Sequence, residues 1–506
     1  MGNKSSKHIV WGSFFSMIVL VTQMIAALVK VRVILTNYGH EYYSIFQSSN
    51  GIFSYLILIE SGFSVAYLLK MYEPYAKKDY QKVQSLYIGL ERMLYKVAAL
   101  MMIGVIAITV IYPVILADNN LGMWEIRILI AVCGMKFVLP YFFTVAKKQI
   151  LNVVEKSYLI SIIDSLVNLI TDIVIILIAC FTNWSFIATV IASVLMLVPS
   201  IAVYTCILQY YKKKLNFSSD VEPSYEASSM TKDIMAQKIA YLADNNVDQI
   251  ILSTRDLLQT TVYTSFNSVV SYPVSLINQL ISSFRGHMGV RLAGNIKSSF
   301  APFRKLLSMN LYIATVISCV FILQAQPFVK LWIGDTYAAT DLTIILFAII
   351  LFRKCAENTI TIARESRDLY KESKKYALCA AAANFVLSML LVQFLEINGL
   401  LLATIAADLL VLDYNNYRIV FHNIFKRKVD IWEELLPSAV AMILSVLAKH
   451  STWFSMLNQS TWVNFVMYSV IVSLIVAMVA LIAYLLCSCY MRKAVLYFIS
   501  HGEREV

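Results

Sequence analysis

Apolar residues in this chain form about fourteen runs of roughly twenty residues or more, separated by short polar connectors. A helix rises about 1.5 Å per residue, so runs of this length can cross a hydrocarbon core of about 30 Å. The pattern therefore predicts an all-α polytopic membrane protein with about 14 transmembrane helices. The predicted spans are 9–35, 43–69, 87–116, 124–146, 158–181, 184–208, 234–254, 258–281, 306–329, 342–363, 376–395, 398–421, 435–450 and 461–486.

Positive charges are distributed unevenly among the connectors. Every second connector holds several Lys or Arg, as in 70–82 and 364–375, whereas the intervening connectors hold only Arg255, Lys330 and Lys449. Lys and Arg stay on the cytoplasmic side of a membrane, so we predict that both termini are cytoplasmic and that the number of spans is even. The same parity requires the weakly apolar thirteenth run to cross the membrane together with the fourteenth.

The longest polar connector, 210–232, divides the predicted spans into groups. Six spans precede it and about six more follow before the connector that holds Lys426. We therefore predict an N-terminal six-helix lobe at 1–209, a cytoplasmic linker at 210–232 and a second six-helix lobe at 233–425. Two extra helices and a cytoplasmic tail fill 426–506. Because six is even, both lobes enter the membrane in the same direction and would be related by an axis along the membrane normal.

Composition agrees with a membrane protein and narrows the function. Hydrophobic residues make up 59% of the chain, charged residues 14%, and the mean hydropathy is +0.69. The net charge of +11 is spread over short connectors, so no nucleic-acid partner is predicted. The sequence has no Gly-rich phosphate loop and no His/Cys metal motif, so we predict no cofactor and no metal. Any transport would then be passive or ion-driven.

Cations inside the predicted spans suggest an anion site. A charge at mid-membrane costs at least about 2.5–3.5 kcal/mol, so charges that persist there normally face a cavity or a partner. Arg353, Lys354 and Glu357 lie near the middle of the tenth span, and Arg32 and Lys136 lie in the first and fourth. Arg offers a planar fork to phosphate oxygens and Lys a point charge. We predict that these four cations bind a diphosphate and that Glu357 lines the cavity.

A structural ion pair is the alternative role for the tenth span, because Arg353 and Glu357 are four residues apart and share a helical face. Lys30 has a simpler interpretation, since it is close enough to the outer end of its span to extend to the interface. Asp408 and Asp413 are expected at the cytoplasmic mouth of the twelfth span.

Acids in two spans are candidates for ion coupling. Asp164 and Asp172 share one face of the fifth span, and Asp244 and Asp248 lie on a polar stripe of the seventh. Such residues line an aqueous path or a bundle interior, where they can exchange a proton or cation. Hydrogen bonding between helices is the alternative for each of them.

Several tracts resemble the Wzx-type oligosaccharide flippases. These form the polysaccharide transporter branch of the multidrug/oligosaccharidyl-lipid/polysaccharide (MOP) exporter superfamily. The first tract, 32–43, contains Arg32, and the second, 58–63, carries Glu60 and Gly62. Tracts 246–253, with Asp248, and 331–334, with the sequence LWIG, add to the resemblance. Length, span number and the central linker are similar as well, so the resemblance covers most of the chain.

The resemblance implies two six-helix lobes around a central cavity that opens alternately to each side. It implies transport of an undecaprenyl-diphosphate-linked oligosaccharide from the cytoplasmic to the outer leaflet of the bacterial inner membrane. Such transport serves lipopolysaccharide O-antigen, capsule or exopolysaccharide assembly. The implied partners are this lipid-linked substrate, membrane lipids, and polymerase and chain-length proteins of the same pathway.

Two other functions remain open. A MATE-like multidrug or organic-cation antiporter of the same fold would need an acidic cavity, and the Arg353–Lys354 pair argues against one. A membrane polysaccharide polymerase or glycosyltransferase would be an enzyme, and such enzymes carry a long catalytic loop outside the membrane. The connectors here are short, so we predict that the protein is not an enzyme.

Overall fold

The described part of the chain consists of helices joined by short connectors. The computed structural model describes residues 21–154, 156–218, 221–226, 247–282, 292, 296–367, 369–455, 459–493 and 495. Every predicted span that lies wholly within these residues is helical over almost its whole length, and these residues contain no strand. Seven of the described helices are long and apolar enough to cross a membrane. The prediction of an all-α polytopic membrane protein is confirmed.

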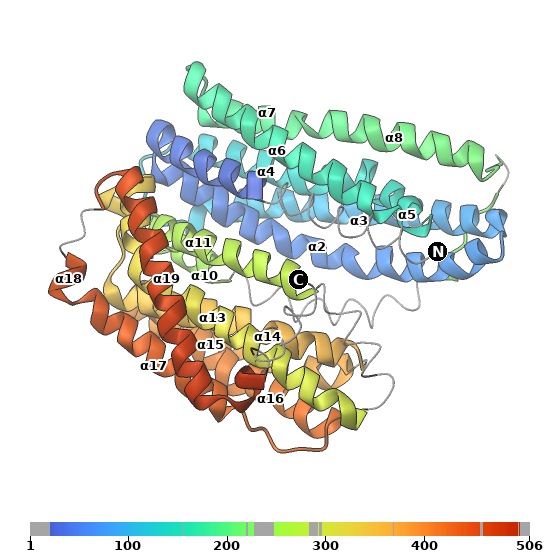
Figure 1. Ribbon diagram of the computed structural model, residues 1–506. Coiled ribbons are helices and arrows are strands. Elements are labelled where there is room, and N and C mark those ends of the chain that lie inside the picture. The colour runs from blue at the N-terminus through green and yellow to red at the C-terminus, as the bar shows by residue number, and fades with distance from the viewer. Residues whose placement is uncertain are drawn as a thin grey trace. The chain divides into compact units, whose positions relative to one another are not determined.

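The chain divides into two compact units, 1–261 and 262–506. In the first unit α2 packs against α3 and α4, and α6 packs against α7 (Figure 1). The predicted lobe boundaries around 210–232 remain a prediction. The helices of this unit are a first helix at 21–38, α2 (His40–Ala76), α3 (Tyr80–Ile115), α4 (Met123–Phe143), α5 (Val145–Val153), α6 (Ser157–Phe181), α7 (Phe186–Leu195), α8 (Leu197–Lys214) and α10 (Val247–Ser253).

Two predicted spans of the first unit are broken near a proline. The fourth span divides into α4 and α5 at Thr144, four residues after Pro140. The sixth divides into α7 and α8 at Met196, three residues before Pro199. Pro199 lacks the N–H that would bond the carbonyl of Leu195, and its ring crowds that carbonyl, which explains the second break. Pro140 lies inside α4, so the first break is not a direct effect of its missing N–H.

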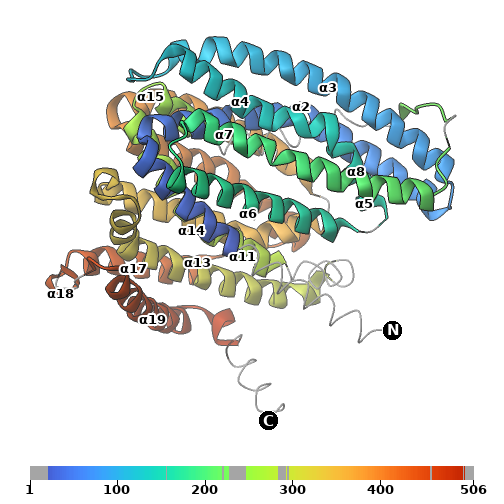
Figure 2. The same ribbon diagram turned by 90° about the horizontal axis from the view of Figure 1, so that it is seen from above.

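The second unit is arranged around α13. This helix packs against α14, α17 and α19, and the views in Figures 1 and 2 agree. Helix α11 (Leu257–Ser282) starts in the first unit and ends in the second. The other elements are α13 (Ile296–Ile333), the 3-10 turn η2 (Asp335–Tyr337), α14 (Asp341–Glu365), α15 (Tyr370–Ala407), the π-helix η3 (Asp408–Asp413), α16 (Tyr414–Arg418), the π-helix η4 (Ile419–Ile424), α17 (Trp432–Lys449), α18 (Thr452–Ser455) and α19 (Trp462–Cys487).

A buried ion pair fastens α17 to α13. Arg304 Nη2 donates to both carboxylate oxygens of Glu434 at 2.9 and 3.0 Å, and Ser308 Oγ donates to the same carboxylate at 2.7 Å. The side chains of the pair are 2% and 0% exposed. The sequence pattern groups Arg304 with a basic connector, but α13 begins eight residues earlier and carries it into the interior. The first of the two extra C-terminal helices is thereby held to the second unit.

Part of the predicted linker lies along α3. We call residues 217–218 and 221–226 the linker strap. Gln84 pairs with Ser218 in both directions, because its amide donates to the Ser218 carbonyl and its Oε1 accepts from the Ser218 N–H at 2.9 Å. Further along, the Ser224 N–H donates to the Ser85 carbonyl at 3.0 Å. The strap is therefore attached to α3 by hydrogen bonds of its backbone.

Two of the lysines that the charge pattern leaves outside are paired with acids. Lys330 lies 3.0 Å from Asp335, and Lys449 lies 2.6 Å from Asp341. Asp341 begins α14, just outside the predicted tenth span. The hydrogen bond from Lys449 holds the pKa of the Asp341 carboxyl below its ordinary value. The pair joins the start of α14 to the end of α17.

Candidate functional site

Three charges from three helices of the first unit lie together; we call them the first-unit cluster. Lys30 Nζ and Asp172 Oδ1 are 2.6 Å apart, with the side chains 21% and 11% exposed. Lys136 of α4 is half-buried and within electrostatic reach of both. Two cations and one acid leave a net positive charge, which is what a phosphate or diphosphate would require.

This cluster corrects the interpretation of Lys30. The sequence predicts that Lys30 extends to the outer interface, but its ammonium points to α6 and pairs with Asp172. Arg32, two residues further on, is exposed. A helix turns about 100° per residue, so the side chains of residues two apart point in very different directions. Of the predicted cations of this unit, Lys136 is the one that the structure brings close to Lys30.

Asp164 lies in a different environment from Asp172, although both are on α6. Its Oδ2 accepts from Lys148 Nζ of α5 at 2.7 Å, and its Oδ1 accepts from Tyr204 of α8 at 2.8 Å. The predicted common face therefore does not form one site. Each acid has its own lysine, so a proton could neutralise either only by breaking an ion pair.

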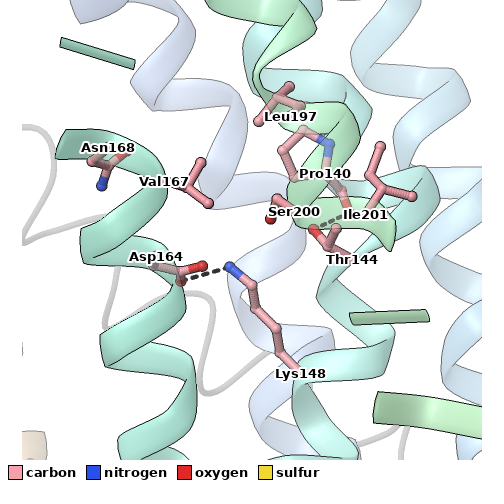
Figure 3. A pocket seen from close by; sticks show the side chains of 9 residues that line it. All are labelled: Pro140, Thr144, Lys148, Asp164, Val167, Asn168, Leu197, Ser200 and Ile201. Carbon is pink, nitrogen blue, oxygen red and sulfur yellow. Dashed lines mark hydrogen bonds and ion pairs between the residues drawn. The ribbon is translucent and has the colours of Figure 1, made fainter. Parts of the chain in front are cut away.

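A cavity of about 210 Å³ lies beside the Lys148–Asp164 pair. Figure 3 shows the two side chains extending toward each other from α5 and α6, with Ser200 and Ile201 of α8 nearby. The lining combines charged, polar and apolar groups. Its residues are Pro140, Thr144, Lys148, Asp164, Val167, Asn168, Leu197, Ser200 and Ile201.

In the second unit, Arg353 of α14 joins two buried acids. Its Nη2 forms an ion pair with Asp408, and its Nη1 lies 3.3 Å from Asp413 Oδ1. Arg353 is 5% exposed, and the side chains of Asp408 and Asp413 are 0% and 10% exposed. The sequence pattern places both acids at an open cytoplasmic mouth, and this prediction is wrong because both are buried against Arg353. A diphosphate could reach the guanidinium only if it displaced one of them.

The π-helix η3 explains how two acids five residues apart meet one guanidinium. In an α-helix, residues five apart point about 140° away from each other. A π-helix bonds residue i to residue i+5, which brings such residues onto one face. Asp408 and Asp413 are the first and last residues of η3. The wider turn is therefore what lets both carboxylates face α14.

Glu357 takes part in a second polar group, one turn further along α14. Its Oε1 accepts from Asn416 Nδ2 of α16 at 3.2 Å. Asn416 Oδ1 in turn accepts from Arg364 at 2.8 Å and from Ser373 at 2.9 Å. Glu357 thus bonds across to α16. We call the contacts from Arg353 to Arg364 the α14 ladder.

The remaining predicted residues have varied surroundings. Lys354 is half-buried on α14, beside Arg353. Asp248 is 5% exposed near the start of α10. The adjacent Gln249 donates to the Gln47 carbonyl of α2 at 3.4 Å. Asp244 lies outside the described residues.

The sequence reasoning missed three partners: Lys30, Lys148 and Asn416. An acid inside a span requires a compensating cation, and this rule could have suggested Lys30 and Lys148 for Asp172 and Asp164. The choice between lysines depends on which helices are neighbours, which the sequence pattern does not give. Asn416 has no charge and stands in a tract that repeats no motif, so no signal identified it.

The arrangement can bind and release charged groups. Among the described residues, no group of three or more His, Cys, Asp or Glu could hold a metal ion. The first-unit cluster combines two lysines, Lys30 and Lys136, with the carboxylate of Asp172. The α14 ladder instead pairs its charges across the interface between α14 and the segment from η3 to α16.

Comparison with known proteins identifies the fold. No family model and no curated protein matches the sequence. Among solved structures, the lipid II flippase MurJ in an inward closed conformation matches with a TM-score of 0.65 at 14% identity, covering 92% of this chain and 98% of MurJ.

MATE multidrug transporters are also similar. The MATE multidrug transporter DinF-BH gives a TM-score of 0.56 at 12% identity, covering 82% of this chain and 96% of its own. An inward-facing MATE transporter of the MOP superfamily gives 0.54 at 13% identity, covering 80% and 98%. At these identities the likeness shows the fold alone: the chain has the fold of MOP superfamily transporters.

Proposed function

We propose that this protein is a flippase that moves an undecaprenyl-diphosphate-linked oligosaccharide from the cytoplasmic to the outer leaflet of the bacterial inner membrane. It would work by alternating access and serve surface polysaccharide assembly, beside polymerase and chain-length proteins. The observation that carries the proposal is the fold shared with a lipid II flippase over 92% of the chain. The tracts that resemble Wzx-type flippases support the oligosaccharide as the cargo.

The first-unit cluster supports a diphosphate-bearing substrate. Lys136 has no acid of its own among the three charges, because Asp172 already pairs with Lys30 at 2.6 Å. A doubly charged diphosphate beside Lys136 would compensate this excess and accept charge-assisted hydrogen bonds. Arg32 and Lys354 are the further proposed contacts. Arg353 would join them only in a state in which it releases Asp408 or Asp413.

Asp172 is the proposed coupling residue of the cluster. Protonation of Asp172 would release Lys30 and raise the positive charge next to Lys136, so a proton and an anionic substrate would favour each other's binding. Asp164, Asp248, Asp244 and Glu357 remain proposals as cavity-lining or coupling residues. Ion coupling fits a sequence that lacks any nucleotide-binding motif.

The test of the proposed function is the position of the glycan in a deletion strain. A flippase moves its substrate but makes none, so deletion should leave lipid-linked oligosaccharide on the cytoplasmic leaflet. A membrane-impermeant lectin would then label spheroplasts of the deletion strain weakly, and re-expression of the protein would restore labelling. Normal labelling in a strain with no second flippase gene would contradict the proposal.

The MATE structures with the same fold favour a second candidate, an organic-cation antiporter. A cation would need uncompensated acids, whereas Asp164, Asp172, Asp408 and Asp413 all lie against a lysine or arginine. Resistance assays separate the two candidates. Expression in a drug-sensitive host should leave the inhibitory concentrations of cationic dyes unchanged if the protein is a flippase.

A further inference from the structure

The cavity between α4, α5, α6 and α8 lies beside two helix breaks. The α4–α5 break follows Pro140, and the α7–α8 break precedes Pro199. Pro140 and Thr144, next to the first break, and Leu197 and Ser200, next to the second, line the cavity. The volume of the cavity is about 210 Å³. This is more than a water molecule requires.

One cation and one anion are fixed at the wall of this space. Lys148 and Asp164 form a 2.7 Å ion pair whose side chains are 24% and 38% exposed. The Tyr204 hydroxyl holds the second oxygen of Asp164 at 2.8 Å. An ammonium has three donors and a carboxylate about four acceptor positions. The pair can therefore bind an additional acceptor at Lys148 and an additional donor at Asp164 while staying intact.

The rest of the lining separates into polar and apolar parts. Thr144, Asn168 and Ser200 supply hydroxyl and amide groups, whereas Val167 and Ile201, with Pro140 and Leu197, supply apolar surface. A ligand that fits has a polar end with both charges and a hydrophobic remainder. Lys148 belongs to a basic connector that the sequence predicts to be cytoplasmic, so the cavity would lie at the depth of the inner-leaflet headgroups.

We propose that this cavity binds the headgroup of a zwitterionic phospholipid that carries a phosphate and a primary amine. The phosphate accepts from Lys148, and the ammonium donates to Asp164. The acyl chains leave along the apolar wall formed by Val167, Leu197 and Ile201. This lipid site is separate from the first-unit cluster and does not depend on the proposed transport function.

The fixed pair of charges makes the site selective. An anionic headgroup such as phosphatidylglycerol meets Lys148 but is repelled by Asp164. Phosphatidylcholine has both charges, but its quaternary amine has no N–H to donate to Asp164. Phosphatidylethanolamine satisfies both residues. A lipid that lacks one of these charge-assisted hydrogen bonds should bind about tenfold more weakly, or weaker still, than phosphatidylethanolamine.

Native mass spectrometry of the purified protein with phosphatidylethanolamine, phosphatidylcholine or phosphatidylglycerol tests the site. We expect the wild type to retain phosphatidylethanolamine about tenfold better than the other two. Asp164→Asn should remove the repulsion and shift the preference to phosphatidylglycerol. The double variant Lys148→Gln/Asp164→Asn leaves no unpaired charge, so it should stay folded and lose all selectivity. Lys147→Gln is the matched control, because Lys147 bonds Thr205 and does not line the cavity.

Three results would overturn the proposal. The first is equal retention of the three lipids by the wild type. The second is an unchanged preference in the folded double variant. The third is displacement of bound phosphatidylethanolamine by soluble phosphoethanolamine at equal concentration, which would make the ligand a free small molecule rather than a lipid. The lipid site requires the Lys148 and Asp164 variants to change selectivity while Lys147→Gln does not.

Discussion

Lys30 and Asp172 stand 142 residues apart in the sequence, and their side chains form a 2.6 Å ion pair between the first helix and α6. The charge of the acid is therefore compensated by Lys30. Any role of Asp172 in coupling requires Lys30 to be released. A change in the charge of Asp172 on α6 would then change the charge that Lys30 presents on the first helix.

Replacement of Asp172 by Asn should separate coupling from transport. The amide keeps the size of the side chain but cannot exchange a proton, so we expect translocation driven by a pH or sodium gradient to slow several-fold. Exchange without a gradient should stay near the wild-type rate. Reconstituted vesicles with and without a gradient provide the measurement. Asp164→Asn is the comparison. We expect a smaller effect because Asp164 pairs with Lys148 of α5 and lies outside the first-unit cluster. Equal loss of both activities would mean that Asp172 only holds helices together.

Arg353→Ala should destabilise the protein, whereas Lys354→Ala should impair transport in a stable protein. Loss of Arg353 leaves two buried carboxylates without their cation, and breaking a buried pair typically costs about 3–5 kcal/mol. Arg353→Lys should restore little, because one ammonium does not match the planar fork that reaches both acids. Thermal unfolding in detergent and complementation of the deletion strain measure the two effects. A stable Arg353→Ala protein that fails to transport would instead support a direct role in binding diphosphate.

The buried pair of Arg304 and Glu434 gives a stability prediction. Glu434→Gln should lower stability by about 3–5 kcal/mol, because it leaves a guanidinium that is 2% exposed without its counter-charge. The double variant Arg304→Met/Glu434→Leu should recover most of this loss, since apolar residues of similar volume often replace a buried pair at little cost. Thermal unfolding of the purified variants tests both expectations. If the double variant is as unstable as the single one, other hydrogen bonds of Arg304 and Glu434 contribute more to stability than the ion pair does.

A side chain at Gly89 should release the linker strap from α3. A Cβ there would lie 2.0 Å from the Ser224 carbonyl oxygen, so the backbone of the strap would have to move in Gly89→Ala. We expect faster amide exchange at Ser218 and Ser224, whose N–H groups bond α3 residues in the wild type. Gly122→Ala is the control, because its Cβ would meet only the Glu125 side chain at 3.6 Å or more. Unchanged exchange in Gly89→Ala would show that the strap does not depend on this contact.

The Asp341–Lys449 pair should contribute stability that disappears in acid. The pKa of Asp341 is lower in the folded protein than its ordinary value of 3.8, so the contribution is present above that pH. The contribution is lost as the pH falls through the pKa that Asp341 has in the folded protein. Asp341→Asn should therefore be less stable than the wild type near neutral pH and equal to it at the acid end. Thermal unfolding of both proteins across this pH range is the measurement. A constant difference would assign the effect to something other than ionisation.

The positions of the helices could be predicted from sequence because the apolar runs within the described residues are helical over almost their whole length. Runs near 306–329 and 342–363 lie within α13 and α14, whose flanking residues extend the helices beyond the apolar part. Basic residues close to a run were harder to assign. The sequence pattern places Arg304 and Lys148 in connectors, yet each lies in a helix and pairs with an acid of another helix.

The partners of the charged residues could not be predicted, because they depend on which helices are neighbours and how each is rotated. Arg353 and Glu357 are four apart, and a regular helix allows them to pair. In the structure Arg353 instead forms ion pairs with Asp408 and Asp413, and Glu357 accepts a hydrogen bond from Asn416. The deciding feature is the π-helix η3, which the apolar periodicity of the twelfth span does not reveal.

The two π-helices, η3 and η4, also affect how this chain is to be aligned with its relatives. Each wide turn accommodates about one residue more than an α-helical turn of the same length. A relative with an unbroken α-helix here would keep the same residues facing α14 only if it were shorter by a residue at each place. An alignment without gaps across 408–424 would therefore pair positions that face α14 with positions that do not. Single-residue gaps within this segment, normally avoided inside a helix, are the correct treatment.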